Sequence, residues 1–339
     1  MLPATDPGVL YALRDGLYAG DLLIAAIAEL DLFTFLGDRP SGPGEICEAM
    51  DLAAEPVDVM CSLCLALGLL ERRGAVLAPT QLAREHLVAG SEWDLRPYFA
   101  SLAGRPAVAE LVAVLRTGRP AAWASAAEGK TWEERLAEPA FAEQITAAMD
   151  ARGRYLAPLL AETLSDLGPT RVLDIAGGSG IYASALVDER PDLQADVFER
   201  PPVDIAARAL LESRGYAGKV GVVAGDMFAG PFPGGYDLHL FSHVFHDWDE
   251  QSVRRLVRSS FESLAPGGWI VDHDAHLAPD KAGPLSVAAY SVLLMHSTEG
   301  RCRSMAEIAA LFEGAGFEEL RTSATGIDRS AVIGHKPQR

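Results

Sequence analysis

Apolar and polar positions alternate with two different periods along this chain, and the clearest signal lies in its second half. Residues 172–175 form a short apolar run that meets a glycine-rich turn, and residues 181–188 then continue with a helical period. Further strand-like runs fall at 195–199 and 222–228, and a fourth lies within 236–248. An amphipathic helical stretch covers 253–264, and another strand follows residues 264–268 and ends at residue 274. Short strands that alternate with helices are typical of a doubly wound sheet. We therefore expect an α/β, Rossmann-like domain over residues 166–339.

The first half follows a different pattern. Residues 41–45 can start one helix, residues 51–70 carry another, and residues 70–77 have the pattern of a small hairpin. This order is similar to a winged helix, which we place in residues 1–100. Residues 101–165 are predicted to be helical, with breaks at 118–120 and 138–139. The chain should close with a helix at 305–314 and two strands at about 317–325 and 329–336.

Charge argues against a nucleic-acid partner. The formal net charge is −18, whereas contacts to phosphates need clustered Lys and Arg. The second helix of the winged-helix pattern would present cations to DNA, yet residues 51–71 hold four acids and no Lys or Arg. Its many apolar residues suit contact with protein instead. We expect no nucleic-acid binding.

Composition and cysteine usage indicate a globular protein of the cytoplasm. The hydrophobic fraction of 49% and the charged fraction of 22% are ordinary for such a protein. The first residues lack the basic and apolar regions of a secretory signal, and we expect no membrane span because no apolar run reaches about 18 residues. Four cysteines do not make a disulfide framework. Cys61 and Cys64 lie within an apolar helical run and are expected to be core or interface thiols.

The turn after the first apolar run is suited to binding a nucleoside. Gly177, Gly178 and Gly180 let the backbone approach a ligand, and the following helix offers unpaired N–H groups. Glu199 ends the next apolar run, 19 residues after Gly180, which is near the spacing of an acid that holds a ribose. Residues 178–183 also satisfy the dinucleotide fingerprint, so the glycines alone leave the nucleoside open. A positive φ at Ala176 would indicate strain.

Later motifs carry a family resemblance. Residues 225–228 are Gly-Asp-Met-Phe, residues 246–248 are His-Asp-Trp, and residues 266–268 are Pro-Gly-Gly. Together with the glycine turn, they resemble the S-adenosylmethionine-dependent methyltransferases of the small-molecule O-methyltransferase type, over most of the chain. The resemblance implies a seven-stranded methyltransferase sheet in residues 166–339. It also implies a winged-helix domain at 1–100 that forms a homodimer, a pocket cap at 101–165, and a role in specialised metabolism such as antibiotic biosynthesis.

The resemblance also assigns binding residues. It implies that S-adenosyl-L-methionine is held by Asp174, Gly177, Gly178, Gly180, Glu199, Asp226, Met227 and Ser242. The small-molecule acceptor would meet Met149, Arg152, Met295 and Arg301. Met149 and Arg152 lie at helical spacing with Phe141 and Ile145, although plain core packing is an equal explanation for the last two.

Catalysis requires an acceptor that is aligned with the methyl group and made nucleophilic. In the resembling family, the residue that matches His246 is the general base. A family acid 28 positions later falls on Asp274, which would orient the imidazole and favour its charged form. The alternative is a structural role, in which His246 only caps a helix.

Three departures from the family pattern point to a metal. Cys302 replaces the family glutamate in residues 300–304, and His243 and His296 add imidazoles. Neutral imidazoles bind zinc and iron(II) well, so His243, His246 and His296 are candidate ligands. This set is similar to metal-dependent C-methyltransferases of 2-oxo acids. It favours metal-assisted C-methylation, with O-methylation by His246 as the alternative and a relative with another activity as a third.

Overall fold

The computed structural model describes residues 2–121 and 132–338, which fall into two compact units. Unit 1 holds residues 1–6, 130–276 and 305–339, and unit 2 holds residues 7–129 and 277–304. The chain therefore leaves unit 1 after His276 and returns to it at Met305. Within the described residues, none of the helices is both long enough and apolar enough to cross a membrane.

Unit 1 is built on the expected sheet. Over the part of the chain that the structure describes, seven strands join in the order β5-β4-β3-β6-β7-β9-β8. The strands are β3 (Arg171–Ile175), β4 (Gln194–Glu199), β5 (Val220–Ala224), β6 (Leu238–Ser242), β7 (Trp269–Asp274), β8 (Glu318–Gly326) and β9 (Arg329–His335). Neighbours from β5 to β7 pair in parallel, whereas β9 is antiparallel to β7 and β8. This mixed, doubly wound sheet confirms the predicted fold class.

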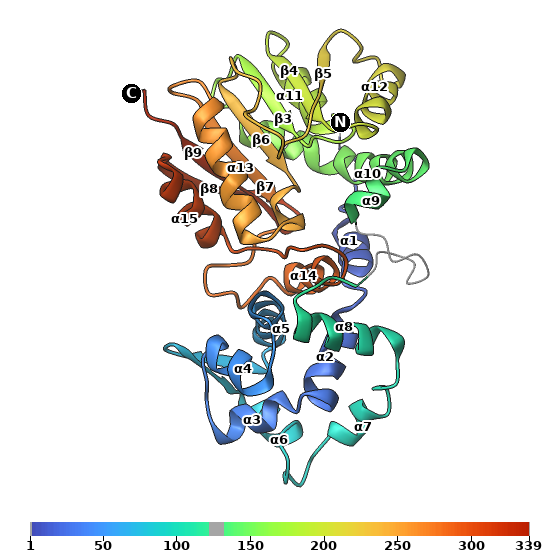
Figure 1. The fold of residues 1–339 in the computed structure, drawn as a ribbon, viewed down its shortest axis with the longest axis vertical. Coiled ribbons are helices and arrows are strands. Elements are labelled where there is room, and N and C mark those ends of the chain that lie inside the picture. Colours follow the sequence, from blue (N-terminus) through green and yellow to red (C-terminus); the bar gives the residue numbers. More distant parts are fainter. Residues whose placement is uncertain (1, 122–131, 339) are drawn as a thin grey trace. The chain divides into compact units, whose positions relative to one another are not determined.

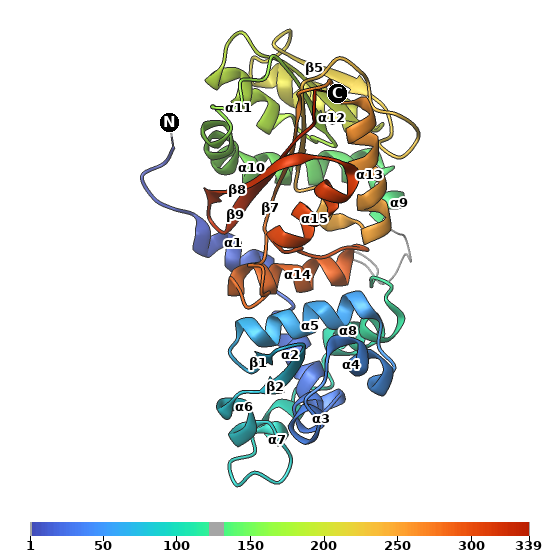
Figure 2. The same cartoon turned by 90° about the vertical axis from the view of Figure 1, so that its left-hand side faces the viewer.

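Helices cover both faces of this sheet (Figure 1, Figure 2). The helices of unit 1 are α9 (Trp132–Leu136), α10 (Pro139–Thr163), α11 (Ile181–Glu189), α12 (Val203–Ser213), α13 (Glu250–Ser263) and α15 (Met305–Ala315). α10 packs against α11 and α12 on one face, and α13 packs against α15 on the other. The predicted helices at 181–188, 253–264 and 305–314 are confirmed within a few residues.

The main core of unit 1 lies between β6, β7 and the α13–α15 face. Ile270, Phe241, Phe312 and Phe317 are almost fully buried there. α13 has one apolar face and begins at a defined residue, because the side chain of Asp249 accepts the N–H of Ser252. These elements fix the carboxyl ends of the parallel strands, where open α/β sheets bind ligands.

Unit 2 is mainly helical and contains the predicted winged-helix elements. Its elements are α1 (Gly8–Asp15), α2 (Ala19–Ile24), η1 (Ala25–Glu29), α3 (Leu32–Asp38), α4 (Pro43–Met50), α5 (Ala54–Ala66), β1 (Leu70–Arg73), β2 (Val76–Pro79), α6 (Gln81–His86), α7 (Arg96–Ala100), α8 (Pro106–Thr117) and α14 (Leu285–Ser297). β1 and β2 form the antiparallel hairpin. α14, which is distant in sequence, packs on α5 and is buried over most of its length. Cys61 and Cys64 are buried free thiols, as expected.

Candidate active site

A buried histidine–carboxylate pair lies at the carboxyl ends of β6 and β7. The His246 Nδ1 donates a hydrogen bond of 2.7 Å to the Asp274 Oδ1. The same oxygen accepts the backbone N–H of Ala275 at 2.7 Å. Both side chains are buried, with 6% and 4% of their surface exposed. The imidazole is therefore held in one orientation and one tautomer, with the proton on Nδ1.

Local backbone structure places His246 beside the sheet. After β6, His243 takes a positive φ of 57°, and its backbone N–H donates to the carbonyl of His273 at 2.9 Å. The chain then forms a short 3-10 helix, η2 (Phe245–Asp247), which contains His246. A non-glycine residue with positive φ is uncommon and is held only where the surroundings demand it.

Electrostatics favour a base that can accept a proton. Burial alone would lower the pKa of His246, but the charges of Asp274 and Asp247 outweigh burial and raise that pKa. Burial would raise the pKa of Asp274, yet the nearby His246 and His243 hold it well below its usual value. Asp274 therefore stays anionic and stabilises an imidazolium at His246.

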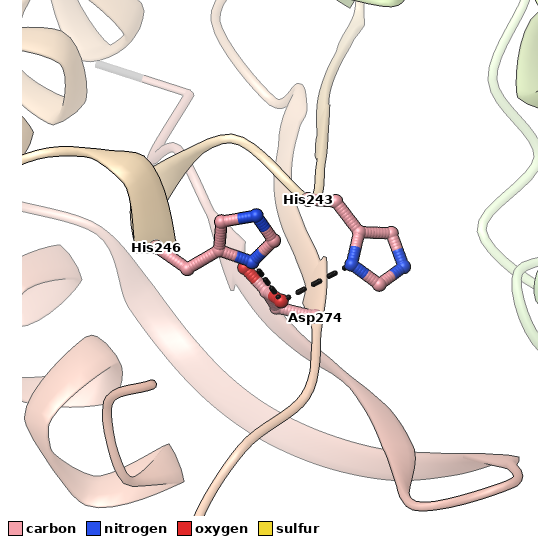
Figure 3. A group of neighbouring side chains, drawn as sticks. All are labelled: His243, His246 and Asp274. Carbon is pink, nitrogen blue, oxygen red and sulfur yellow. Dashed lines mark hydrogen bonds and ion pairs between the residues drawn. The ribbon is translucent and has the colours of Figure 1, made fainter. Parts of the chain in front are cut away.

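His243 extends the pair to a group of three side chains (Figure 3). Its Nδ1 lies 3.3 Å from the Asp274 Oδ1, an ion-pair distance that lacks the alignment of a hydrogen bond. Neither ring nitrogen of His243 has a hydrogen-bond partner in the described part of the chain. Burial and the charge of Arg152 keep its pKa well below the usual value, so the ring is neutral. One ligand atom from each of His243, His246 and Asp274 fits within 4.8 Å.

The glycine turn after β3 forms a second polar region of unit 1. Ala176 has a φ of 53°, and Gly178 and Gly180 have φ values of 54° and 70°. The positive φ at Ala176 meets the condition that the sequence analysis set for strain. A Cβ on Gly177 would lie 2.5 Å from the Asp174 carboxylate, so that position excludes a side chain.

Two buried carboxylates flank this turn. Glu199 accepts the N–H of Gly178 at 3.1 Å and that of Arg200 at 2.9 Å. Neither oxygen of Asp174 makes a well-aligned hydrogen bond to a described residue, although the backbone N–H of Ala183 lies near enough to lower its pKa somewhat. Burial raises the pKa of each group to about 7. Buried acids with open acceptor sites are costly alone, and a ligand with hydroxyl and cationic groups would satisfy them.

The other expected cofactor residues follow neighbouring strands. Asp226 and Met227 come directly after β5, and the Asp226 Oδ1 accepts the N–H of Phe228 at 2.8 Å. Ser242 ends β6, with its Oγ 3.5 Å from the Nδ1 of His273. Because β5 and β6 run parallel to β3 and β4, these residues share the carboxyl end of the sheet with the glycine turn.

The expected acceptor residues divide between the two units. Met149 and Arg152 are half-buried on α10 in unit 1. Met295 is buried on α14 in unit 2, and Arg301 lies 3.1 Å from Asp58 there. Each unit therefore carries part of the expected set.

His296, the third expected metal ligand, has its own partners in unit 2. Its Nε2 pairs with the Glu110 Oε2 at 2.9 Å, and its ring stacks on Tyr18 at 4.1 Å between centroids. In the compact group of unit 1, the carboxylate of Asp274 stands with the two histidines instead. Cys302 is buried, and its N–H donates to the Ser291 Oγ at 3.0 Å.

One polar cluster in the site region has no counterpart in the sequence analysis. The His276 Nε2 pairs with Asp272 at 2.9 Å, and its Nδ1 pairs with the Ser330 Oγ at 2.8 Å. Ser330 lies opposite Asp274 in the register of β7 and β9. The spacing of Asp272 and His276 along the chain could suggest the pair, but Ser330 comes from a distant strand.

Comparisons with known proteins identify the family. The O-methyltransferase domain family matches residues 108–318. The 3-hydroxy-5-methyl-1-naphthoate 3-O-methyltransferase of Streptomyces sahachiroi is 30% identical over 318 residues, which cover 93% of this chain and 91% of that protein.

Two solved structures extend the likeness to the whole fold. An O-methyltransferase family 2 protein from Planctomyces limnophilus, in complex with apigenin, has a TM-score of 0.87 and 30% identity, and the match covers 99% of this chain and 98% of that one. Human N-acetylserotonin methyltransferase, in complex with SAM, has a TM-score of 0.59 at 24% identity, with 99% of this chain and 100% of that chain covered. The latter likeness concerns the fold alone.

Proposed function

This chain belongs to the O-methyltransferase domain family and is an S-adenosylmethionine-dependent methyltransferase, and from that premise we propose that it methylates a hydroxyl group of a small aromatic acceptor. The hydrogen bond between His246 and Asp274 is the observation that carries the proposal. The predicted likeness to 2-oxo acid C-methyltransferases gains no support from these relatives. Hydroxyl methylation, the alternative in the sequence analysis, therefore becomes the main hypothesis.

The chemistry asks two things of the protein. S-adenosyl-L-methionine, when bound, supplies a methyl group from its sulfonium, and the demethylated donor is a neutral thioether that acts as the leaving group. His246 directs its Nδ1–H at Asp274, so Nε2, which lies 3.6 Å from the Asp247 Oδ1, is the nitrogen that would take the proton of the acceptor hydroxyl. Asp274 stabilises the resulting imidazolium. The acceptor oxygen thus gains the electron density needed to form the new C–O bond.

The cofactor is proposed to lie at the glycine turn. Glu199 has the position expected of an acid that holds a ribose diol, and the open oxygens of Asp174 suit a cationic ligand. Gly177, Gly178 and Gly180 keep side chains away from the turn. Asp226, Met227 and Ser242 would complete the cofactor site, and Met149 and Arg152 of unit 1 would contact the acceptor. The roles of Met295 and Arg301, which belong to unit 2, stay predictions.

The relatives support an aromatic acceptor. One relative is named as acting on a hydroxy-naphthoate, and one solved relative is in complex with apigenin. We extend this to an aromatic compound with a free hydroxyl, of the kind made in natural-product biosynthesis.

Assay with labelled donor and a panel of hydroxy-naphthoates and flavones tests the proposal. His246→Ala should lower kcat by about 10²–10⁴ while the affinity for the cofactor stays the same. His86→Ala, which changes a histidine of unit 2, is the matched control and should have wild-type activity. Full turnover by His246→Ala would exclude His246 as the base.

A second candidate rests on the group of His243, His246 and Asp274. Two imidazoles and a carboxylate are a donor set that fits iron(II) or zinc, and neither ring nitrogen of His243 makes a hydrogen bond to a described residue. His296, which the sequence indicated as a third ligand, belongs to unit 2 and stays a prediction. A metal there would supply a Lewis acid that stabilises an enolate for C-methylation.

Metal analysis separates the two candidates. The second candidate requires about one zinc or iron per chain in the purified protein, and labelled product from 2-oxo acids that disappears with chelator or with His243→Ala. Methylation of phenols by metal-stripped protein at the full rate would exclude it.

We also propose that the protein forms a homodimer through unit 2. An exposed apolar face lies at the start of the chain, where Val9, Leu10, Leu13 and Leu17 are each at least 64% exposed. Val9, Leu10 and Leu13 lie on α1 and Leu17 follows its end, and exposed apolar side chains grouped in this way favour contact with another protein surface. A second copy is the occupant expected from the family resemblance.

A further inference from the structure

The glycine turn needs support from its surroundings. Three of its positions, at Ala176, Gly178 and Gly180, have φ between 53° and 70°, and Ala176 is a residue type that seldom adopts such values. A turn of this kind keeps one shape only where neighbouring groups fix it. The groups that fix it therefore also control how well it receives a ligand.

Two side chains hold two peptide groups of the turn, the one between Gly177 and Gly178 and the one between Ser179 and Gly180. The Glu199 Oε2 accepts the N–H of Gly178 at 3.1 Å. The Arg214 Nη2 donates to the carbonyl of Ser179 at 2.6 Å. One contact fixes a donor and the other fixes an acceptor, so the orientation of two successive residues is set. Glu199 belongs to the proposed cofactor site, whereas Arg214 has no assigned role.

Arg214 is itself held firmly. Its Nη1 donates to the Asp150 Oδ1 at 2.7 Å, and its Nε donates to the carbonyl of Leu210 at 3.2 Å. Asp150 and Arg214 are both largely buried, with 6% and 13% of their side chains exposed. The planar guanidinium thus joins α10, the end of α12 and the glycine turn. Charge-assisted hydrogen bonds of this kind are stronger than neutral ones.

α10 also supports the helix that follows the turn. A Cβ on Gly153 would lie 2.3 Å from the Ile181 Cγ2, so the backbone of α10 approaches the first residue of α11 very closely. Gly153 is one helical turn from Asp150. A role limited to anchoring α12 would need only the bonds to Asp150 and Leu210. The third bond, to Ser179, acts on the turn itself.

We propose that Arg214, anchored by Asp150, is a positioning residue for S-adenosylmethionine. It sets the shape of residues 177–180 and so raises cofactor affinity without taking part in methyl transfer. The inference rests on the cofactor placement given under Proposed function, and it is independent of which acceptor is methylated.

Calorimetry tests this directly. Arg214→Gln should weaken binding of S-adenosylmethionine and of its demethylated product by about tenfold each. Arg214→Lys keeps the charge but not the fork, so its affinities should fall between those of the wild type and Arg214→Gln. At saturating cofactor, kcat and the acceptor KM should stay within about twofold of the wild-type values. A purely structural role would lower the thermal midpoint and leave both affinities unchanged.

The matched control is Arg321→Gln, which removes an arginine–carboxylate pair with Asp166 at 2.8 Å elsewhere in unit 1. It should bind both ligands as the wild type does. Wild-type affinity in folded Arg214→Gln would overturn the inference. If Arg214→Gln does not fold, Asp150→Asn decides, because it should weaken both ligands about threefold. Glu199→Ala, measured alongside, distinguishes failure of the Arg214 inference from failure of the cofactor placement. Unchanged affinity in Glu199→Ala would mean that the cofactor placement itself is wrong.

Discussion

At the residue scale, the sequence predicted that His246 and Asp274 act together, but it did not predict the arrangement of the side chains around them. A spacing of 28 residues and a family motif named both residues. The contact of His243 with the same oxygen follows from a positive φ after β6, which no residue type signals. His296 was predicted as the third ligand because the sequence shows which residues are histidines but not their neighbours. In the structure, His296 pairs with Glu110 and stacks on Tyr18.

The pH dependence of catalysis should report this pair. Because the pKa of His246 is raised above its usual value, the neutral base is lost as pH falls through that raised pKa. We expect kcat/KM to rise with pH through an apparent pKa above about 6.5. Asp274→Asn removes the anion, so the rising limb should move to lower pH while the maximum falls at least about tenfold. A limb that stays in place would contradict the assignment.

Asp174 makes a separate prediction for the cofactor-free protein. Burial raises its pKa to about 7, so the folded state favours the protonated acid. Its stabilising contribution is present below about pH 4 and is lost as pH rises through about 7. Relative to the wild type, Asp174→Asn should therefore gain stability between pH 5 and pH 8, on the order of 2 kcal/mol. Thermal unfolding at several pH values measures it, and a difference that is flat with pH would contradict it.

At the scale of elements, most helices and strands of unit 1 were predicted within a few residues. Their apolar periods are regular, and Pro, Gly and Asp mark several of their ends. The link between α10 and the glycine turn was not predicted. Arg214 and Asp150 are 64 residues apart, and nothing in either segment indicates that they meet. Contacts of this kind depend on the packing of whole helices.

The close approach of α10 to α11 can be tested by substitution. Gly153→Ala places a Cβ where it meets Ile181, and such overpacking should cost about 1–3 kcal/mol of unfolding free energy. Ile181→Ala in the same chain removes the obstructing side chain and should recover part of that loss. Gly314→Ala is the control, since a Cβ there meets nothing within 4 Å, and it should be neutral or slightly stabilising. Additive effects of the two alanines would disprove the contact.

At the scale of the whole molecule, the sequence indicated where the cofactor turn and the catalytic pair lie along the chain, but not how the chain divides into compact units. Boundaries at residues 100 and 165 were expected from changes in pattern. In the described residues, the compact units instead divide between residues 121 and 132, and unit 2 also includes residues 277–304. An apolar helix such as α14 could be buried in the core of either unit, so its sequence does not indicate which unit it joins.

The proposed homodimer belongs to this scale. A chain of 36.1 kDa should sediment at twice that mass at micromolar concentration. Replacing Leu10 and Leu13 together with Glu should convert it to monomer, because each charge would lie in the apolar contact. Ile205→Glu, at a residue of unit 1 that is 65% exposed, is the matched control and should leave the mass unchanged. A dimer that survives the double change would place the interface elsewhere.

The path of the chain between the two units limits how they can be separated. Only two residues lie between Asp274 and the start of the excursion into unit 2, and the return comes at Met305. No single nick in the polypeptide therefore releases both halves intact: a break near residue 130 would leave the first fragment without α14. Unit 2 is encoded by two separate stretches of the gene. An exchange of the helical half for another domain therefore requires both stretches to be replaced together.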